Sequence, residues 1–352
     1  MKFWRMLAVV TGVYFTILFT QSRAERLDVI AQLKAAQLEQ VISDYYYQLY
    51  LLSTRDTIES ALSAKRAGNV SYSVTNSATD TIFQLLQSSD YLNAAKLYDQ
   101  DLNSVCTVAN NETATNITSD DVLNQLFVLE LNKTSLPNGL MDHGSYLYGP
   151  IQANGSSFIS MTLPVYTNTS VLISTPSLGG YLSMIINIDS MQSITNSTSS
   201  SYYTGVEILK SNHALNNWTD IQSFSYVFDT QNYSRPDEAF PLDVYQPADD
   251  TWGWSQTTGH YTSVRKPDGQ KVALGYSKLS LSYADWLVTV EQTRSKFMSP
   301  TIKLTKIMVG VCFGIALVLV ILTFPLAHYG VRPIIDLQRA TEEITRRRGL
   351  KN

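Results

Sequence analysis

The sequence predicts an α+β ectodomain held between two apolar, membrane-directed segments. Three observations carry this prediction: an uncharged apolar segment near each end, nine Asn-x-Ser/Thr sequons between them, and a change from helical to alternating periodicity after Asp90. Sequons are useful only in a compartment with glycosylation machinery, so the middle of the chain is expected outside the cell. The predicted glycosylation sites are Asn69, Asn111, Asn116, Asn132, Asn154, Asn168, Asn196, Asn217 and Asn232.

The first apolar segment, Met6–Thr20, has 15 uncharged residues. As a helix it would be about 22 Å long, which is short for the roughly 30 Å hydrocarbon core of a bilayer. Ser22-Arg23-Ala24 has the small-x-small pattern of a signal-peptidase site. Two interpretations are therefore open: a cleaved signal peptide, or a retained transmembrane helix over residues 6–22 after a cytoplasmic start at residues 1–5.

Residues 23–66 contain neither proline nor glycine and are expected to form one long helix. Their apolar side chains recur in alternating steps of four and three residues, which is a heptad seam. Such a seam can pack on its own domain or pair with a second copy of the chain, and both uses remain open. The seam consists of Ala31, Ala35, Leu38, Ile42, Tyr45, Leu49 and Leu52.

The alternating periodicity beyond Asp90 predicts half-buried antiparallel strands. A tight turn is expected at Lys266–Gly269, where Pro-Asp-Gly favours a reversal of the chain. We expect two sheet modules in series, a membrane-distal one over residues 67–200 and a membrane-proximal one over residues 201–306. The predicted strands include Ile159–Val165, Leu182–Ile188, Tyr202–Lys210, Phe224–Phe228 and Trp286–Val290.

The second apolar segment, Ile307–Ala327, has 21 residues without a charge and is long enough to cross a bilayer as a helix. Pro325 removes one backbone donor near its inner end, so a kink is expected there. Residues 328–352 carry an excess of positive charge, which is typical of a cytoplasmic flank.

An amphipathic helix is predicted to begin at Arg332-Pro333-Ile334, directly after the membrane. Its apolar residues, Ile334, Leu337 and Ile344, recur at helical spacing up to Gly349. This pattern resembles the first helix of a HAMP linker, so residues 328–352 are interpreted as a partial HAMP linker. The candidate signal-transmission residues are Pro325, Pro333, Leu337 and Ile344.

The chain shows no catalytic constellation. It lacks a phosphate-binding loop, an H-E-x-x-H zinc motif and a G-x-S-x-G elbow, and its four histidines are far apart. We therefore expect no catalytic residue, no cofactor and no metal site. Asp249, Asp250, Trp252 and Trp254 could hold a sugar through carboxylate hydrogen bonds and ring stacking.

Between Ala67 and Ser234 there are thirteen acidic residues and three basic ones, none of them arginine. Such an acidic surface excludes nucleic acid as a partner. Cys106 is external whereas Cys312 lies in the second apolar segment, so the two cannot pair within one chain. Cys106 is interpreted as a buried free thiol or as an intermolecular link.

Four runs resemble the sensor half of the fungal osmosensing hybrid histidine kinases of the budding-yeast turgor-sensor type. They are Val10–Thr16 (VTGVYFT), Ile30–Ala36 (IAQLKAA), Ala273–Ser277 (ALGYS) and Leu322–Ile334 (LTFPLAHYGVRPI). The resemblance implies a plasma-membrane homodimer with two transmembrane helices, an extracellular double-Cache sensor of two PAS-like modules, and a HAMP linker. The family's phosphoacceptor histidine, nucleotide-binding boxes and receiver aspartate would lie beyond residue 352, so this chain is not expected to be an enzyme.

Three functions follow as hypotheses. The first is a sensor that passes a turgor or wall signal across the membrane by helix movement in a dimer. The second is a chemoreceptor for a small molecule, with Tyr146, Tyr148 and Asp99 among its available groups. The absence of arginine between Ala67 and Ser234 disfavours an amino-acid ligand, since carboxylates are usually clamped by a guanidinium. The third is a wall-associated glycoprotein without a signalling role. Expected partners are a second copy, the membrane and cell-wall components.

Overall fold

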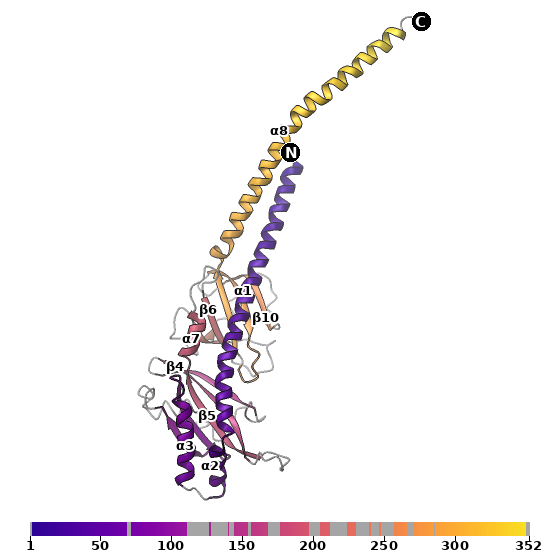
Figure 1. The fold of residues 1–352 in the computed structure, drawn as a ribbon. Helices are drawn as coiled ribbons and strands as arrows, with labels where there is room; N and C mark the ends of the chain where they lie inside the picture. Colours follow the sequence, from indigo (N-terminus) through magenta and orange to yellow (C-terminus); the bar gives the residue numbers. More distant parts are fainter. Residues whose placement is uncertain are drawn as a thin grey trace. The chain divides into compact units, whose positions relative to one another are not determined.

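The computed structural model describes residues 2–68, 72–110, 127, 140, 144–153, 156–167, 177–196, 205–211, 224–229, 239–240, 246–247, 257–265, 270–284 and 286–349. The chain forms two compact units. One consists of Met1–Arg23 together with Ser295–Asn352, and the other of Ala24–Arg294. The larger unit contains both β-sheets, and the smaller one is built from helical segments (Figure 1).

Helix α1 extends from Lys2 to Ser53 and carries the predicted seam. All seven seam residues are at most 7% exposed, so the seam packs within its own chain. Of the two uses left open by the sequence, the structure therefore shows packing on the chain's own domain. A second apolar stripe of α1 stays exposed, and it includes Val29, Leu33, Tyr47 and Leu51.

The prediction of one helix over residues 23–66 is wrong at its C-terminal end. α1 ends at Ser53, and a separate helix, α2, covers Asp56–Arg66. The hydroxyls of Ser53 and Thr54 donate to the carbonyls of Tyr50 and Leu51, at 2.7 and 3.1 Å. Short hydroxyl side chains compete in this way with the backbone ladder, and Arg55 then adopts an extended conformation.

Helix α2 is favoured by the placement of its charges. Asp56 and Glu59 lie in the first turn and Lys65 and Arg66 in the last, which complements the helix dipole. Gly68 follows the helix with a φ of 70°, a conformation that costs glycine little and often ends helices. The next helix, α3, covers Tyr72–Leu86.

The first sheet is antiparallel and has the order β2-β1-β5-β4-β3. Its outer strands are therefore formed by segments far apart in the sequence, and its two longest strands lie near the centre. Helix α7, Asp189–Asn196, follows the last of these strands. The strands are β1 (Leu92–Asp99), β2 (Ser104–Ala109), β3 (Tyr146–Ala153), β4 (Ser156–Thr167) and β5 (Ser177–Asn187).

Strands β4 and β5 are more buried than the sequence predicts. Their alternation indicates one polar, exposed face, yet Ser160, Thr162 and Ser183 are at most 2% exposed. The reason is that both faces of the sheet are covered. Ile159, Met161 and Leu163 are buried on one face, while Phe158 belongs to an apolar cluster on the other. The polar positions therefore form part of the interior.

The second sheet is antiparallel and has the order β8-β7-β6-β12-β11-β10-β9. The predicted turn at Lys266–Gly269 lies outside the described residues, between two strands that pair with each other. The predicted module boundaries remain a prediction, because both sheets belong to one compact unit. The strands are β6 (Gly205–Ser211), β7 (Phe224–Asp229), β8 (Ala239–Phe240), β9 (Gln246–Pro247), β10 (Thr258–Arg265), β11 (Lys271–Lys278) and β12 (Trp286–Thr293).

Helix α1 approaches β11 at backbone distance. A Cβ atom placed on Gly275 would overlap the backbone carbonyl of Leu27 and the amide nitrogen of Asp28. Further along α1, the buried Lys34 ammonium donates to the carbonyl of Ile194 in α7, with an Nζ–O distance of 2.6 Å. Burial lowers the pKa of Lys34. The long helix is thus held by close backbone packing and by a buried hydrogen bond.

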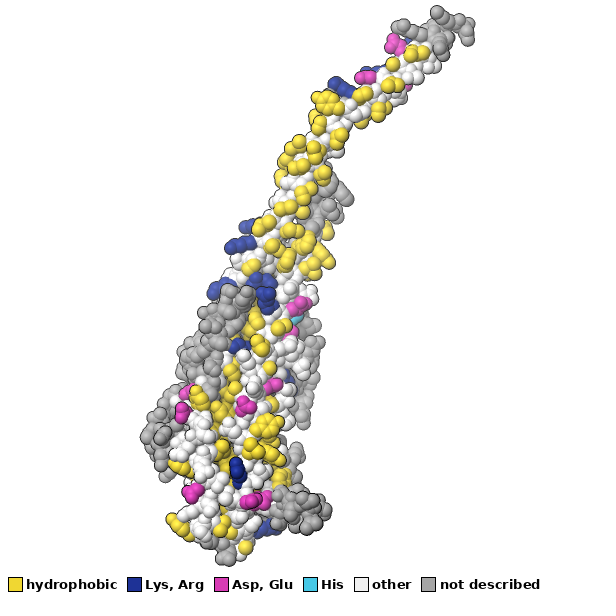
Figure 2. All heavy atoms as spheres, in the orientation of Figure 1, with side chains coloured by type: hydrophobic (Ala, Val, Ile, Leu, Met, Phe, Trp, Pro, Cys, Tyr) yellow, Lys and Arg dark blue, Asp and Glu magenta, His cyan; other side chains and the backbone are white. Residues whose placement is uncertain are grey.

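Helix α8 extends without interruption from Arg294 to Gly349. The expectation of a new helix at Arg332 is therefore wrong, because the helix passes through both Pro325 and Pro333. Figure 1 shows that α8 bends along its course. Among the described residues, one helical stretch, Arg294–Arg346, is long and apolar enough to cross a membrane. Its hydrophobic side chains line its surface (Figure 2).

The substitution Gly275→Ala is expected to destabilise the larger unit by about 3 kcal/mol, because the added methyl group meets backbone atoms that cannot rotate away. The midpoint of denaturant unfolding of the full chain measures this effect. Gly310→Ala is the matched control, since nothing lies within 4 Å of that position and alanine favours a helix. Equal midpoints for the two variants would contradict the close packing of α1 on β11.

Candidate functional site

A row of polar side chains crosses the first sheet. The strand register places Lys96 of β1 opposite Ser183 of β5, Ser183 opposite Thr162 of β4, and Thr162 opposite Tyr146 of β3. Directly opposite residues on an antiparallel sheet share a face. Ser160 lies two positions before Thr162 and therefore joins the same face. We call these five residues the polar face.

Four members of the polar face are buried. Ser183, Ser160 and Thr162 are 0, 1 and 2% exposed, and Lys96 is 8% exposed. The hydroxyls of Thr162 and Ser183 hydrogen-bond to each other. The Ser160 Oγ, in contrast, has no hydrogen-bond partner within the described part of the chain. A buried hydroxyl without a partner costs free energy, so its position suggests a group that binds something.

The Lys96 ammonium lies against two aromatic rings. Its Nζ is 5.5 Å from the ring centroids of both Tyr98 and Phe127, within the range of a cation–π interaction. The two rings meet edge to face with centroids 6.5 Å apart. An ammonium carries three donors and hydroxyls both donate and accept, so this face can bind a small polar or anionic ligand.

The chemoreceptor residues predicted from the sequence are divided by the fold. Tyr146 and Tyr148 are adjacent on this side of β3, with near-parallel rings 6.4 Å apart, and burial raises the pKa of Tyr146. Asp99 belongs elsewhere, because its carboxylate accepts from the backbone amides of Asp101 and Asn103, at 3.0 and 2.8 Å. That carboxylate stabilises the turn after β1.

Sequence reasoning missed Lys96 as a site residue and counted it only as one of three basic residues. A usable signal was present. Lys96 lies in the strand Leu92–Asp99 between the apolar residues Ala95 and Leu97, where a charge is buried only at a cost.

In the smaller unit, the start of α1 meets α8 through small residues. Thr16 and Thr305 approach to 3.0 Å between their hydroxyls, and the Thr20 hydroxyl donates to the Met298 sulfur at 3.9 Å. A Cβ on Gly12 would lie 3.6 Å from Val309. Residues 12, 16 and 20 thus form a small-xxx-small stripe, the pattern by which helices pack closely in membranes.

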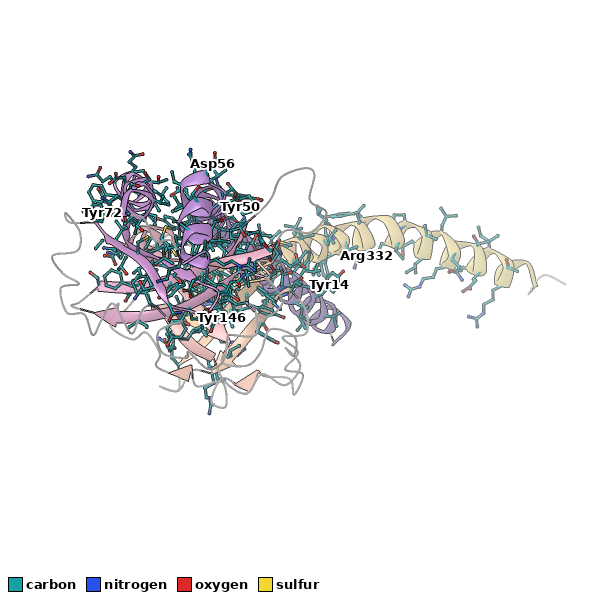
Figure 3. The ribbon with its side chains drawn as sticks, turned by 90° about the horizontal axis from the view of Figure 1, so that it is seen from below. Tyr14, Tyr50, Asp56, Tyr72, Tyr146 and Arg332 are labelled. Atoms are coloured by element: carbon teal, nitrogen blue, oxygen red, sulfur yellow. The ribbon has the colours of Figure 1, made fainter. Side chains whose placement is uncertain are left out.

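The predicted transmission residues all lie in α8. Leu337 and Ile344 are 71% and 59% exposed. Pro325 and Pro333 lie within the helix, and Arg332, labelled in Figure 3, marks the stretch near the second proline.

Of the nine sequons, Asn196 is the last residue of α7. The other eight asparagines lie outside the described residues, as do Asp249, Asp250, Trp252 and Trp254. Cys106 and Cys312 are free in this chain. Burial raises the pKa of the Cys106 thiol, which keeps it protonated and unreactive.

No family model matches the chain. The chain is 35% identical over 350 residues to the osmosensing histidine protein kinase SLN1 of Saccharomyces cerevisiae. That alignment covers 98% of this chain and 28% of the yeast protein. It therefore relates nearly the whole chain to a region of a larger sensor protein.

Two solved sensory domains share the fold. The ligand-binding domain of the Pseudomonas aeruginosa amino acid chemoreceptor PctC, in complex with GABA, aligns with a TM-score of 0.50 and 12% identity, over 76% of this chain and 99% of that domain. The periplasmic sensory domain of the Campylobacter jejuni chemoreceptor Tlp1 aligns with a TM-score of 0.51 and 13% identity, over 80% of this chain and 99% of that domain. The ectodomain therefore has the double-Cache, PAS-like fold of chemoreceptor sensory domains.

The substitution Ser160→Ala is expected to leave stability unchanged or raise it by up to about 1 kcal/mol, because it removes a buried hydroxyl without a partner. Ser183→Ala is the contrast, since it leaves the Thr162 hydroxyl without its partner and should cost about 1–3 kcal/mol. Thermal unfolding of the full chain measures both. A similar loss of stability in the two variants would show that Ser160 serves only the fold.

Proposed function

We propose that this chain is the sensory input region of an osmosensing histidine kinase, located in the plasma membrane with residues 23–306 outside the cell. The supporting observation is the alignment of 98% of the chain with the yeast kinase, including both apolar ends as well as the ectodomain. The chain itself would be non-catalytic and would act on a kinase core through the helix that follows the membrane. The retained first span, the second span at Ile307–Ala327 and the HAMP-like end all belong to this proposal.

In this proposal the ectodomain acts on α8 through β12. Strand β12 ends at Thr293 and α8 begins at Arg294, so no loop separates the sheet from the helix. β12 pairs with β11, which is the strand that α1 contacts at Gly275. A change in how α1 packs on the sheet would therefore reach α8 through two hydrogen-bonded strands. Displacements of about 1–2 Å are typical of helix signalling.

The dimer of this proposal would use the exposed stripe of α1. The heptad seam is already buried within one chain, so it cannot also form the interface. Val29, Leu33, Tyr47 and Leu51 remain 58–61% exposed on another side of the same helix. Asp44 is exposed within this stripe, one turn before Tyr47. Repulsion between the two Asp44 carboxylates across a parallel pair would keep the association weak enough to change state.

The experiment replaces the matching region of the yeast kinase with residues 1–352 and measures osmotic output in cells. Leu337→Asp should lock this output and reduce its osmotic response at least about tenfold, because a charged side chain at this exposed apolar position would no longer pair in the dimer. Gln338→Ala, on the adjacent side of α8, is the control and should respond normally. A normal osmotic response in Leu337→Asp would exclude transmission through this helix.

A second candidate function is reception of a small polar molecule, favoured by Lys96 and Ser160 on the polar face. The stretch from Ala67 to Ser234 has no arginine to clamp a carboxylate with two hydrogen bonds, but the buried Lys96 ammonium can attract an anionic group as a point charge. A ligand at 100 times its dissociation constant stabilises the folded state by about 2.7 kcal/mol. A compound that raises the unfolding temperature of the wild type but not of Ser160→Ala would favour reception over a purely mechanical stimulus.

A further inference from the structure

A cleft separate from the polar face lies in the larger unit. Its volume is about 860 Å³, and it is lined by the end of α1, by strand β4 and by the segment between β11 and β12. It therefore joins the long helix to both sheets. Clefts of about 300–1,000 Å³ are typical of small-ligand sites. The tyrosine cleft, as we name it, contains Tyr46, Tyr47, Tyr50, Tyr166 and Tyr283.

Three of the rings form a ladder. Tyr46 is near-parallel to Tyr283, with centroids 5.1 Å apart, and near-parallel to Tyr50, at 6.3 Å. Tyr47 meets Tyr46 edge to face at 5.6 Å. Two of these rings are exposed, Tyr47 by 60% and Tyr50 by 49%. Aromatic side chains gathered at a cleft rather than scattered on the surface indicate a binding site.

The polar groups of the cleft are mostly hydroxyls. Ser43, Ser145 and Ser282 line it, and among its described lining residues Glu59 is the one with a carboxylate, while none is lysine or arginine. The Ser280 hydroxyl and backbone amide donate to the Glu39 carboxylate, which fixes the β11–β12 segment against α1. A lining without a cationic side chain disfavours an anionic ligand.

The ring arrangement decides between a cation and a neutral ligand. A cage for an ammonium group needs ring faces that converge on one point within about 6 Å. Here the rings of Tyr50, Tyr46 and Tyr283 lie nearly parallel, at 16° to each neighbour, so the central ring already stacks with its neighbours. Such a ladder suits an extended ligand with apolar C–H faces and a hydroxyl rim, which are the properties of linked hexose rings.

We propose that the tyrosine cleft binds a neutral oligosaccharide, with hexose rings lying on Tyr47 and Tyr50 and their hydroxyls bonded by the serines and Glu59. A polysaccharide of the cell wall held here would connect the wall to α1 and to both sheets at once. This signalling consequence rests on the proposed sensory function, whereas the binding itself does not.

The test is calorimetric titration of the full chain in detergent, enzymatically freed of N-glycans, with β-1,3-linked glucohexaose and with α-linked mannohexaose. We expect saturable binding of at least one of them. Tyr47→Ala and Tyr50→Ala should each weaken it about tenfold, as expected for the loss of one stacked ring. Tyr50→Phe keeps the ring and should bind within about threefold of the wild type. Tyr72→Ala is the control, because that ring is 83% exposed on α3, a different helix (Figure 3).

Unchanged unfolding midpoints of the tyrosine variants would show that lost binding is not lost folding. No saturable binding of either hexasaccharide, or equal affinity in Tyr50→Ala, would overturn the proposal. Binding of choline that depends on the tyrosines, without binding of a hexasaccharide, would also overturn the proposal, because choline is a cation.

The signalling role is tested separately in the yeast chimera. Tyr50→Ala with lost binding and a normal osmotic response would remove the oligosaccharide from signalling while leaving the proposed sensor function intact. Loss of the osmotic response in the wild-type chimera, with oligosaccharide binding retained, would contradict the proposed function. The proposed binding site in the tyrosine cleft would be unaffected by that result.

Discussion

The packing of α1 on the two sheets is the interaction on which the rest of the ectodomain depends. Its buried seam supplies apolar contacts along about three heptads, and Gly275 lets its backbone approach β11 without an intervening side chain. Lys34 adds a hydrogen bond from the helix to α7, which leads from one sheet to the other. The Lys210 ammonium, which donates to the carbonyl of Gly149 at 3.2 Å, adds a link between the sheets themselves.

This arrangement separates the roles of the two sides of α1. One side is buried in its own chain, and the other presents the exposed stripe and the tyrosine cleft. Tyr47 belongs to both the stripe and the cleft, so in the proposed dimer a ligand in the cleft would lie beside the partner chain. Binding and association would then be coupled in free energy, which is the requirement for transmission from one site to another.

Much of the fold follows from sequence periodicity because the periodic segments are long. The seam of α1 and the alternation in β4, β5 and β12 are strong local signals. The break at Ser53–Arg55 could not be predicted, because the same hydroxyl-to-backbone hydrogen bonds also occur inside uninterrupted helices, as from Thr16 to Gly12 and from Thr305 to Thr301. The burial of Ser160 and Thr162 could not be predicted either, since it requires cover on the second face of the sheet by segments distant in sequence. The same applies to the site: Lys96, Ser183 and Thr162 come together only through strand pairing.

In the proposed dimer, α1 changes its association with a second copy when the osmotic stimulus changes. Disulfide cross-linking in cells tests it most directly, with Leu33→Cys in a chimera whose Cys106 and Cys312 are replaced by serine. We expect a cross-linked dimer whose yield differs between low and high osmolarity, while Tyr72→Cys on α3 gives little cross-link in either condition. An absence of Leu33→Cys dimer, or a yield that osmolarity leaves unchanged, would contradict it.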